Sequence, residues 1–199
     1  MSKQAWLVGR DGVPHPIDPR VDASPSGRPY RLYRFLTEVE ELLEAAGDPE
    51  PRLVALAARV RRLLRDAPWL SDELEPAPVD PGYSIEALYD EPGLESVVQL
   101  VAWLAGGARG AHDHGHLALV AVLSGVERHT FWRRRPDGDT GDAGLEQVTT
   151  LELGPGSLVA LAPDAVHSVE VLADVVSLNL YGASPRSSVA ALDAGEHAL

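Results

Sequence analysis

The chain has 199 residues, 45% of them hydrophobic, which is enough to bury the core of one domain. Its 17 basic and 30 acidic side chains give a net charge of −13, which argues against nucleic-acid or anionic-membrane binding, since both need a basic face. The sequence contains no cysteine, which excludes disulfide scaffolds, thiolate metal sites and cysteine nucleophiles, so any bound metal must be held by His, Asp or Glu.

No segment of the sequence predicts targeting or membrane insertion. The longest apolar run, residues 117–123, is far shorter than the roughly 20 residues that span a bilayer. The apolar run near the N-terminus is too short for the core of a signal peptide. We therefore expect a cytoplasmic protein, a monomer or small homo-oligomer, that binds a small molecule and neither nucleic acid nor membrane.

The first 82 residues predict an arm, two helices and a linker that pack on the rest of the chain. Residues 1–29 are rich in Pro, Gly and Asp without a hydrophobic period, which predicts an extended arm or loop. Apolar residues recur at three- and four-residue steps over residues 30–46 and again over 51–67, which predicts two amphipathic helices. Residues 71–82 contain three prolines and predict a linker.

Residues 83–199 predict a β domain with a C-terminal tail. Short runs rich in β-formers are separated by clusters of Gly, Pro or Asp. These runs are residues 97–104, 117–123, 126–133, 147–153, 157–161, 166–172 and 175–181. Seven or eight short strands at this spacing indicate an antiparallel sandwich or barrel, with a long loop at 135–144. The chain as a whole is expected to be one mainly β structural domain with an N-terminal helical segment.

Three of the seven histidines fall between residues 112 and 116. His112 and His114 are two apart, so on a strand their imidazoles would share one face. Imidazole suits iron, nickel, copper and zinc, and His167, at the start of a predicted strand, is the candidate for a third ligand. His116 is a fourth ligand, a supporting group or a rim residue. An isolated His-x-His pair is more often an ordinary core or surface pair than a metal site, so the choice between the two depends on the surrounding sequence.

The surroundings of these histidines match a two-motif pattern. Gly106 precedes the pair and Gly125 follows it, and a second turn, Gly154-Pro-Gly156, precedes Pro163-Asp-Ala-Val-His167. This pattern resembles the signature of the cupin superfamily over residues 83–182. The resemblance implies an antiparallel barrel, the double-stranded β-helix or jelly roll, that holds a metal with the His-x-His pair and the later His.

The sequence departs from the cupin pattern at two places. Ala165 replaces the usual Gly of the second motif. Many metal cupins carry a Glu three or four residues after the His pair, where this chain has Ala118 and Leu119. A neutral three-histidine site remains, with positions open for substrate and dioxygen, as in non-haem iron oxygenases.

Among cupins without that Glu, the chain resembles the cysteine dioxygenase or thiol dioxygenase family of bacterial type. Helices precede the barrel, Trp103 stands nine residues before His112, and His112-Asp-His-Gly115 matches the start of the family motif. Ser177-Leu-Asn-Leu-Tyr181 resembles the family's S-x-H-x-Y pattern.

The resemblance implies a role for each matching residue. His112, His114 and His167 would bind one Fe(II), with dioxygen as co-substrate and a small thiol as substrate. Tyr181 would present its phenol to the reactants, with Ser177 and Asn179 behind it in a hydrogen-bonded chain. Asn179 replaces the family's His, so a titratable link becomes a fixed amide. The absence of cysteine excludes the Cys–Tyr crosslink found in some family members.

The residues that would bind the rest of the substrate are less conventional. The family's Y-x-R clamp for the substrate carboxylate corresponds here to Tyr83-Ser-Ile-Glu86, which has no Arg. Either another Arg holds the carboxylate or the substrate is not a plain α-amino acid. Arg186 follows Tyr181 as an Arg does in bacterial mercaptopropionate dioxygenases, and Arg109 and Arg128 are further candidates. Tyr83, Trp103 and His116 complete the expected substrate-binding set.

The leading hypothesis is a non-haem Fe(II) oxygenase that converts a small thiol, cysteine or a related mercapto acid, to a sulfinate. A specialised substrate of secondary metabolism is a variant of it. Two alternatives stay open: a metal-dependent cupin of other chemistry, such as a carbon-bond dioxygenase, isomerase or lyase, and a non-catalytic cupin that binds a small ligand.

Overall fold

The structure is a computed structural model that describes residues 4–19, 30–45, 47–67, 69–70, 77, 79–90, 96–135 and 144–182. The helices are α1 (Leu32–Glu44) and α2 (Pro49–Asp66). The strands are β1 (Ala5–Val8), β2 (Pro14–Pro16), β3 (Tyr83–Asp90), β4 (Val97–Trp103), β5 (Ala108–His112), β6 (Ala118–Arg134), β7 (Leu145–Leu153), β8 (Leu158–Leu161) and β9 (Val166–Tyr181).

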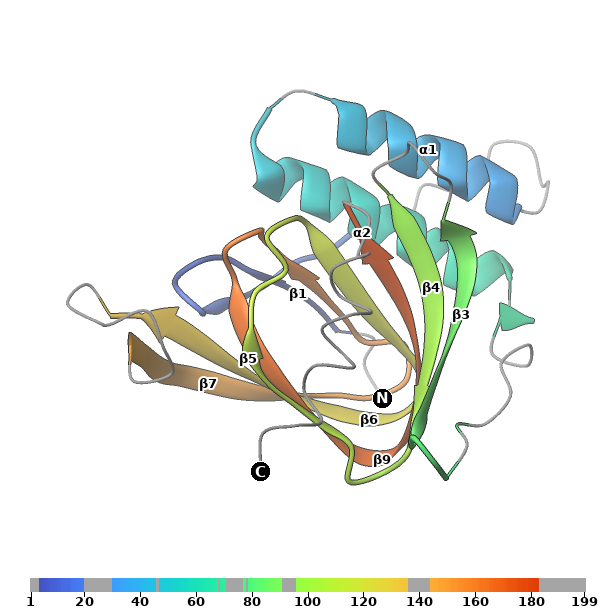
Figure 1. The fold of residues 1–199 in the computed structure, drawn as a ribbon. Coiled ribbons are helices and arrows are strands. Elements are labelled where there is room, and N and C mark those ends of the chain that lie inside the picture. The colour runs from blue at the N-terminus through green and yellow to red at the C-terminus, as the bar shows by residue number, and fades with distance from the viewer. Residues whose placement is uncertain are drawn as a thin grey trace.

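The nine strands of the described residues belong to one curled sheet, in the order β2-β1-β8-β6-β9-β4-β3, with β5 added on β9 and β7 on β6. Every pair is antiparallel except β1 with β8. The long strands β6 and β9 pair along most of their length, and both helices lie on one side of the sheet (Figure 1). The predicted fold class, a mainly β jelly-roll barrel with an N-terminal helical segment, is confirmed.

The two faces of the sheet bury different side chains because successive residues of a strand point to opposite faces. One face packs on the helices: Leu119 and Leu178 join Phe35 and Leu53 in a single hydrophobic cluster. The other face lines the inside of the curl, where Val120 and its alternating neighbours form a second cluster. The helices therefore seal the outside of the sheet and leave its inner face to the cavity described below.

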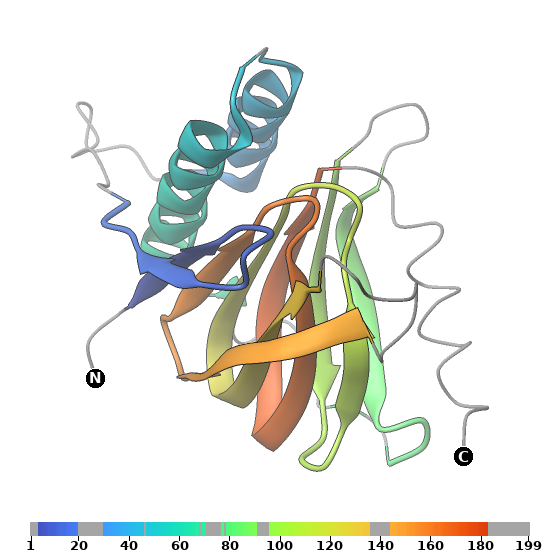
Figure 2. The ribbon, with the colours of Figure 1, turned by 90° about the vertical axis from the view of Figure 1, so that its left-hand side faces the viewer.

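The N-terminal arm is not the featureless loop that its composition predicted. β1 pairs in parallel with β8, and β2 pairs with β1 (Figure 2). Ala5, Leu7 and Val8 of β1 are buried. The prediction failed because a four-residue strand is too short to show a hydrophobic period. Its stability comes from pairing with a strand about 150 residues further along the chain.

Four of the predicted strands merge into two. The runs at 117–123 and 126–133 are one strand, β6, and those at 166–172 and 175–181 are one strand, β9. Gly125, which predicted a break, lies at a bend with φ of +77°, and a Cβ there would come within 2.1 Å of the Asp174 carbonyl oxygen. The glycine lets β6 bend against β9 without ending, and the pairing register shifts at this point.

Besides β1 and β2, two more strands were not among the predicted runs. β3 adds an edge to β4, and β5, with the sequence Ala-Arg-Gly-Ala-His, brings the first histidine to β9. β5 lacks the apolar alternation that marks a strand, since its side chains face a polar cavity. Most of the predicted linker at 71–82, most of the loop at 135–144 and the tail after residue 182 lie outside the described residues. None of the described helices is long and apolar enough to cross a membrane.

The helix–sheet interface predicts a large cost for truncating Phe35, which is 0% exposed on α1. The Phe35→Ala variant should lower the free energy of unfolding by about 3–5 kcal/mol, because it removes apolar contacts and leaves a cavity. Tyr33→Ala, on the exposed side of the same helix, should change it by no more than about 0.5 kcal/mol. Denaturant unfolding measures both values, and equal effects would contradict the packing described here.

Candidate metal centre

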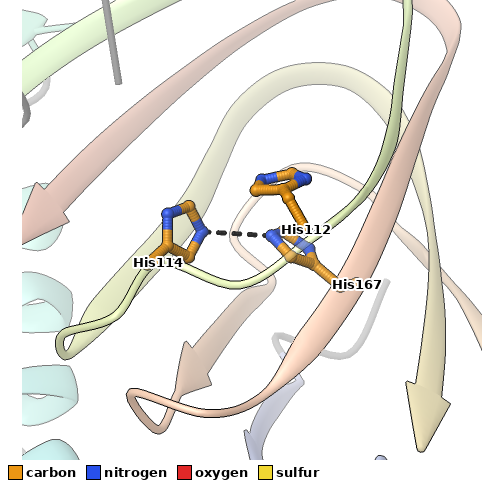
Figure 3. A group of neighbouring side chains, drawn as sticks. All are labelled: His112, His114 and His167. Carbon is orange, nitrogen blue, oxygen red and sulfur yellow. Dashed lines mark hydrogen bonds between the residues drawn. The ribbon is translucent and has the colours of Figure 1, made fainter. Parts of the chain in front are cut away.

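Three histidines converge at the end of the cavity where β5 meets β9. His112 is the last residue of β5 and pairs in register with His167, the second residue of β9. His114 lies just beyond β5, in a turn tied to the segment before β9 by the hydrogen bond from Gly115 N–H to the Pro163 carbonyl. One ligand atom from each histidine lies within 4.8 Å of the other two (Figure 3). The three predicted ligands are therefore brought together, although His114 reaches the cluster from a turn and not from a strand.

The hydrogen bonds around the cluster determine which ring nitrogens face its centre. The Nδ1–H of His112 donates to the Gly110 carbonyl at 2.8 Å, which leaves its Nε2 free. The Nε2 atoms of His114 and His167 face each other at 3.1 Å. Two nitrogens bound to one metal at about 2.0–2.1 Å and near a right angle lie about 3 Å apart, so this separation fits a shared ion. The donor set is one that iron and other divalent first-row metals accept.

Burial keeps these imidazoles uncharged. It lowers the pKa of His114 to about 3 and, together with the neighbouring histidines, the pKa of His167 well below its usual range. The pKa of His112 is also lowered, mainly by burial. Neutral imidazoles present their lone pairs at physiological pH, so a metal can bind without displacing protons from them.

The histidines line a cavity of about 240 Å³, a size suited to a small organic molecule. Many of its lining residues carry polar or aromatic side chains: Gln99, Trp103, Arg109, His112, His114, His116, Glu127, His129, His167, Ser177, Asn179 and Tyr181. All of them come from the inner faces of β4, β5, β6 and β9 or from the turn after β5. The strand alternation that buries leucines under the helices thus assembles this polar wall.

Tyr181 ends β9 beside the cluster, with its ring centroid 5.3 Å from that of His114. Burial, with a smaller contribution from Glu127, raises its pKa to about 12, so the hydroxyl is a neutral hydrogen-bond donor at physiological pH. Its side-chain partner is Gln99 on β4, which the sequence analysis did not single out.

Ser177 and Asn179 precede Tyr181 on the same face of β9. The amide of Asn179 donates to the Ser177 hydroxyl at 3.3 Å. The hydrogen-bonded chain implied by the family pattern therefore has a different arrangement, with Gln99 supporting the tyrosine. Gln99 on β4 pairs in register with Asn179 on β9. Once this pairing is known, it identifies Gln99 as a residue of the cavity wall.

Arg109 lies three residues before His112 and lines the cavity together with it. It is about half buried, burial lowers its pKa, and the described residues offer it no ion-pair partner. Tyr83 and Trp103 meet edge to face at 6.5 Å and line an adjoining open groove that also reaches Arg109 and His112. These are the predicted substrate-binding residues, and they lie together.

The other candidates for substrate contact fall in different places. His116 lines the cavity, and its Nε2 is buried without a hydrogen-bond partner in the described part of the chain. Arg186 lies outside the described residues. Arg128 lies away from the cavity and forms ion pairs with Glu152 and Glu170, so it is not part of the site.

Sequence reasoning missed two buried polar residues that adjoin the cluster, Glu127 and His129 of β6. They are 4% and 0% exposed. The Nδ1 of His129 lies 3.1 Å from Nδ1 of His167, and its Nε2 lies 2.8 Å from the Glu127 carboxylate. In the sequence, polar residues that alternate along a strand are typical of a face exposed to solvent. Only the pairing with β9, which brings His167 beside His129, shows that Glu127 and His129 face the cavity.

No protein-family model matches the chain, and no curated protein matches it. Similar solved structures include a cupin superfamily protein from Desulfitobacterium hafniense, with 13% identity, 56% of this chain and 85% of that chain covered, and a TM-score of 0.44. An RmlC-like cupin from Shewanella frigidimarina has 13% identity, covers 59% of this chain and 90% of its own, and has a TM-score of 0.43. A third, from Desulfovibrio desulfuricans, has 16% identity, coverages of 55% and 89%, and a TM-score of 0.40.

All three are described as cupins. None of the three is described as a thiol dioxygenase.

The lowered pKa of His114 predicts acid destabilisation of the metal-free protein. Unfolding returns the pKa from about 3 to the ordinary value of 6.5, so between these values the unfolded state binds more protons. The free energy of unfolding should therefore fall as the pH drops from 7 to 4, and it should fall less in His114→Asn. Urea unfolding with a chelator present measures this slope, with His15→Asn, an exposed histidine of β2, as the control. An unchanged slope in His114→Asn would contradict the assignment.

Proposed function

We propose that the protein is a mononuclear non-haem iron oxygenase that oxidises the sulfur of a small thiol acid to a sulfinate. The reaction is R–SH + O₂ → R–SO₂⁻ + H⁺: the S–H bond is lost, two S–O bonds form, sulfur gives up four electrons and dioxygen accepts them. The observation that carries the proposal is the convergence of three neutral histidines, one partly buried phenol and one arginine without an ion-pair partner among the described residues on a single small cavity.

His112, His114 and His167 would hold the iron, since their donor atoms and spacing fit a shared ion. Ferrous iron would supply a Lewis acid that favours the thiolate form of the substrate and a redox centre through which the electrons of sulfur reach dioxygen. With three uncharged ligands, the protein contributes no anionic ligand, so an anionic thiolate is a complementary partner for the site.

Arg109 supplies the charge for the other end of the substrate. A half-buried guanidinium without an ion-pair partner in the described chain binds a carboxylate more strongly than an exposed one, because less water competes. It lies on β5, three residues before His112, and lines the same cavity, so a carboxylate bound to it would lie in the cavity of the metal ligands. Arg109 would bind the substrate carboxylate in place of the arginine of the Y-x-R clamp, which this chain lacks.

Tyr181, Trp103 and His116 surround the space between these two ends. Burial keeps the Tyr181 hydroxyl protonated although its hydrogen bond with Gln99 acts the other way on its pKa, and this hydroxyl can donate a hydrogen bond to the reacting sulfur or to the sulfinate oxygens. The buried Nε2 of His116 offers an acceptor for a substrate N–H group. The aromatic pair Tyr83 and Trp103 borders the groove beside Arg109, which leaves room for an acid longer than cysteine.

Oxygen uptake by the iron-loaded protein tests this proposal. Iron is loaded without air, and cysteine, 3-mercaptopropionate and cysteamine are then supplied with dioxygen. We expect uptake with a thiol acid and one sulfinate formed per dioxygen. Arg109→Leu should raise the KM for thiol acids about 10- to 150-fold, because a hydrogen bond to a charged group contributes about 1.5–3 kcal/mol. Cysteamine, which has no carboxylate, should be affected little.

Arg128→Gln is the matched control, since it removes an arginine of the same sheet that lies outside the cavity. It should leave the KM unchanged. Full iron occupancy without thiol-dependent uptake would contradict the oxygenase assignment. Equal effects of Arg109→Leu on thiols with and without a carboxylate would contradict the role of Arg109 alone.

A further inference from the structure

We infer that Glu127 and His129 are positioning residues of the metal centre: through a buried hydrogen-bonded chain they fix His167 with Nε2 toward the ion and connect a carboxylate to it. The inference rests on the three-histidine metal site of the proposed function, but not on thiols or dioxygen. Neither residue is a ligand, and each would act through His167.

The chain runs across two neighbouring strands. Glu127 and His129 alternate on the inner face of β6, and His167 lies on β9 opposite Phe131 in the register. The links measure 2.8 Å from the Glu127 carboxylate to His129 and 3.1 Å from His129 to His167. With exposures of 4%, 0% and 2%, the three side chains exclude competing water.

Only one arrangement of protons satisfies this chain when His167 binds a metal through Nε2. Nδ1 of His167 then carries the proton and donates to Nδ1 of His129. The proton of His129 is therefore on Nε2, from which it donates to the Glu127 carboxylate. The Glu127 carboxylate accepts a proton-bearing Nε2 from a neutral His129, which leaves Nδ1 of His129 as an acceptor. This acceptor favours the tautomer of His167 with its proton on Nδ1 and its Nε2 free for the metal.

Ring stacking fixes the same histidine in orientation. The rings of His129 and His167 are 5.3 Å apart and inclined by 15°. Phe131 stacks beside both, at 6.2 Å and 21° from His129 and at 6.4 Å and 14° from His167. Three nearly parallel rings leave His167 little freedom to rotate about its side-chain bonds.

In this arrangement of protons, His129 is uncharged and does not balance the charge of the Glu127 carboxylate. A buried carboxylate is costly unless it is paired, and among the described residues its one ion-pair contact is with His129. A divalent cation on the far side of His167 provides the balancing charge along the chain. Many metal cupins have a carboxylate ligand at the positions that Ala118 and Leu119 occupy here. In this chain Glu127 supplies a carboxylate that is not a ligand but is connected to the ligand His167 through His129.

Cobalt(II) affinity tests the inference without any turnover. Competition with a coloured chelator gives the dissociation constant for wild type, His129→Leu, His129→Gln and Glu127→Gln. We expect His129→Leu to weaken binding about 10- to 100-fold, the usual effect of removing a partner of a metal ligand. His129→Gln should recover most of this loss, because an amide also offers one acceptor and one donor. Glu127→Gln should fall between wild type and His129→Leu, since it keeps an acceptor but loses the charge.

Thermal melting of the metal-free variants separates positioning from folding. The increase in Tm on adding cobalt should be smaller in His129→Leu and Glu127→Gln than in wild type, whatever their metal-free Tm. Thr130→Val is the matched control: it removes a neighbouring hydrogen bond to Thr150 and should leave cobalt affinity unchanged.

Two results would overturn the inference: wild-type cobalt affinity in His129→Leu, or equal weakening in His129→Leu and His129→Gln, which would indicate packing alone. If wild type binds no cobalt, the metal site itself is wrong and the inference falls with it. If all variants behave as expected and no thiol is oxidised, the inference stands and the proposed reaction does not.

Discussion

The register of β9 between β5 and β6 is the constraint on which the site depends. His167 faces His112 across one edge of this strand and the Phe131 position across the other. Further along, the same alternation turns Ser177, Asn179 and Tyr181 inward, while Leu178 and Leu180 pack toward the helices. A slip of one residue would exchange these two sets, putting the histidine and tyrosine under the helices and leucines in the cavity. The apolar face under α1 and α2 therefore fixes the position of polar groups that the helices never touch.

The buried charges of the described site are arranged around neutral ligands. Glu127 lies behind His167 on β6, and Arg109 lies beside His112 on β5. A cation held by the histidines would lie between a carboxylate, which favours it, and a guanidinium, which favours an anionic group of a substrate. In the proposed function, the metal would lie on the side of the cavity toward Glu127, and the acid group of the substrate would lie toward Arg109 and the open groove.

The features that sequence reasoning recovered are those recorded in local pattern. The helices follow from the spacing of residues such as Phe35 and Val39, and the three candidate ligands follow from the His-x-His pair and a histidine after a turn. What it missed depends on pairing between distant segments. β1 exists because β8 is beside it, and Gly125 marks a bend and not an end because Asp174 lies opposite. Glu127 and His129 have an ordinary alternating polar pattern, and their relation to the metal site appears only when the pairing of β6 with β9 brings His167 beside His129.

Anomalous diffraction at the iron absorption edge, from crystals grown anaerobically with ferrous iron, would locate the metal. We expect one peak within bonding distance of the Nε2 atoms of His112, His114 and His167, with Nδ1 of His167 still hydrogen-bonded to His129. A peak held by other residues, or full iron density with His167 turned away from it, would show that these histidines do not form the iron site.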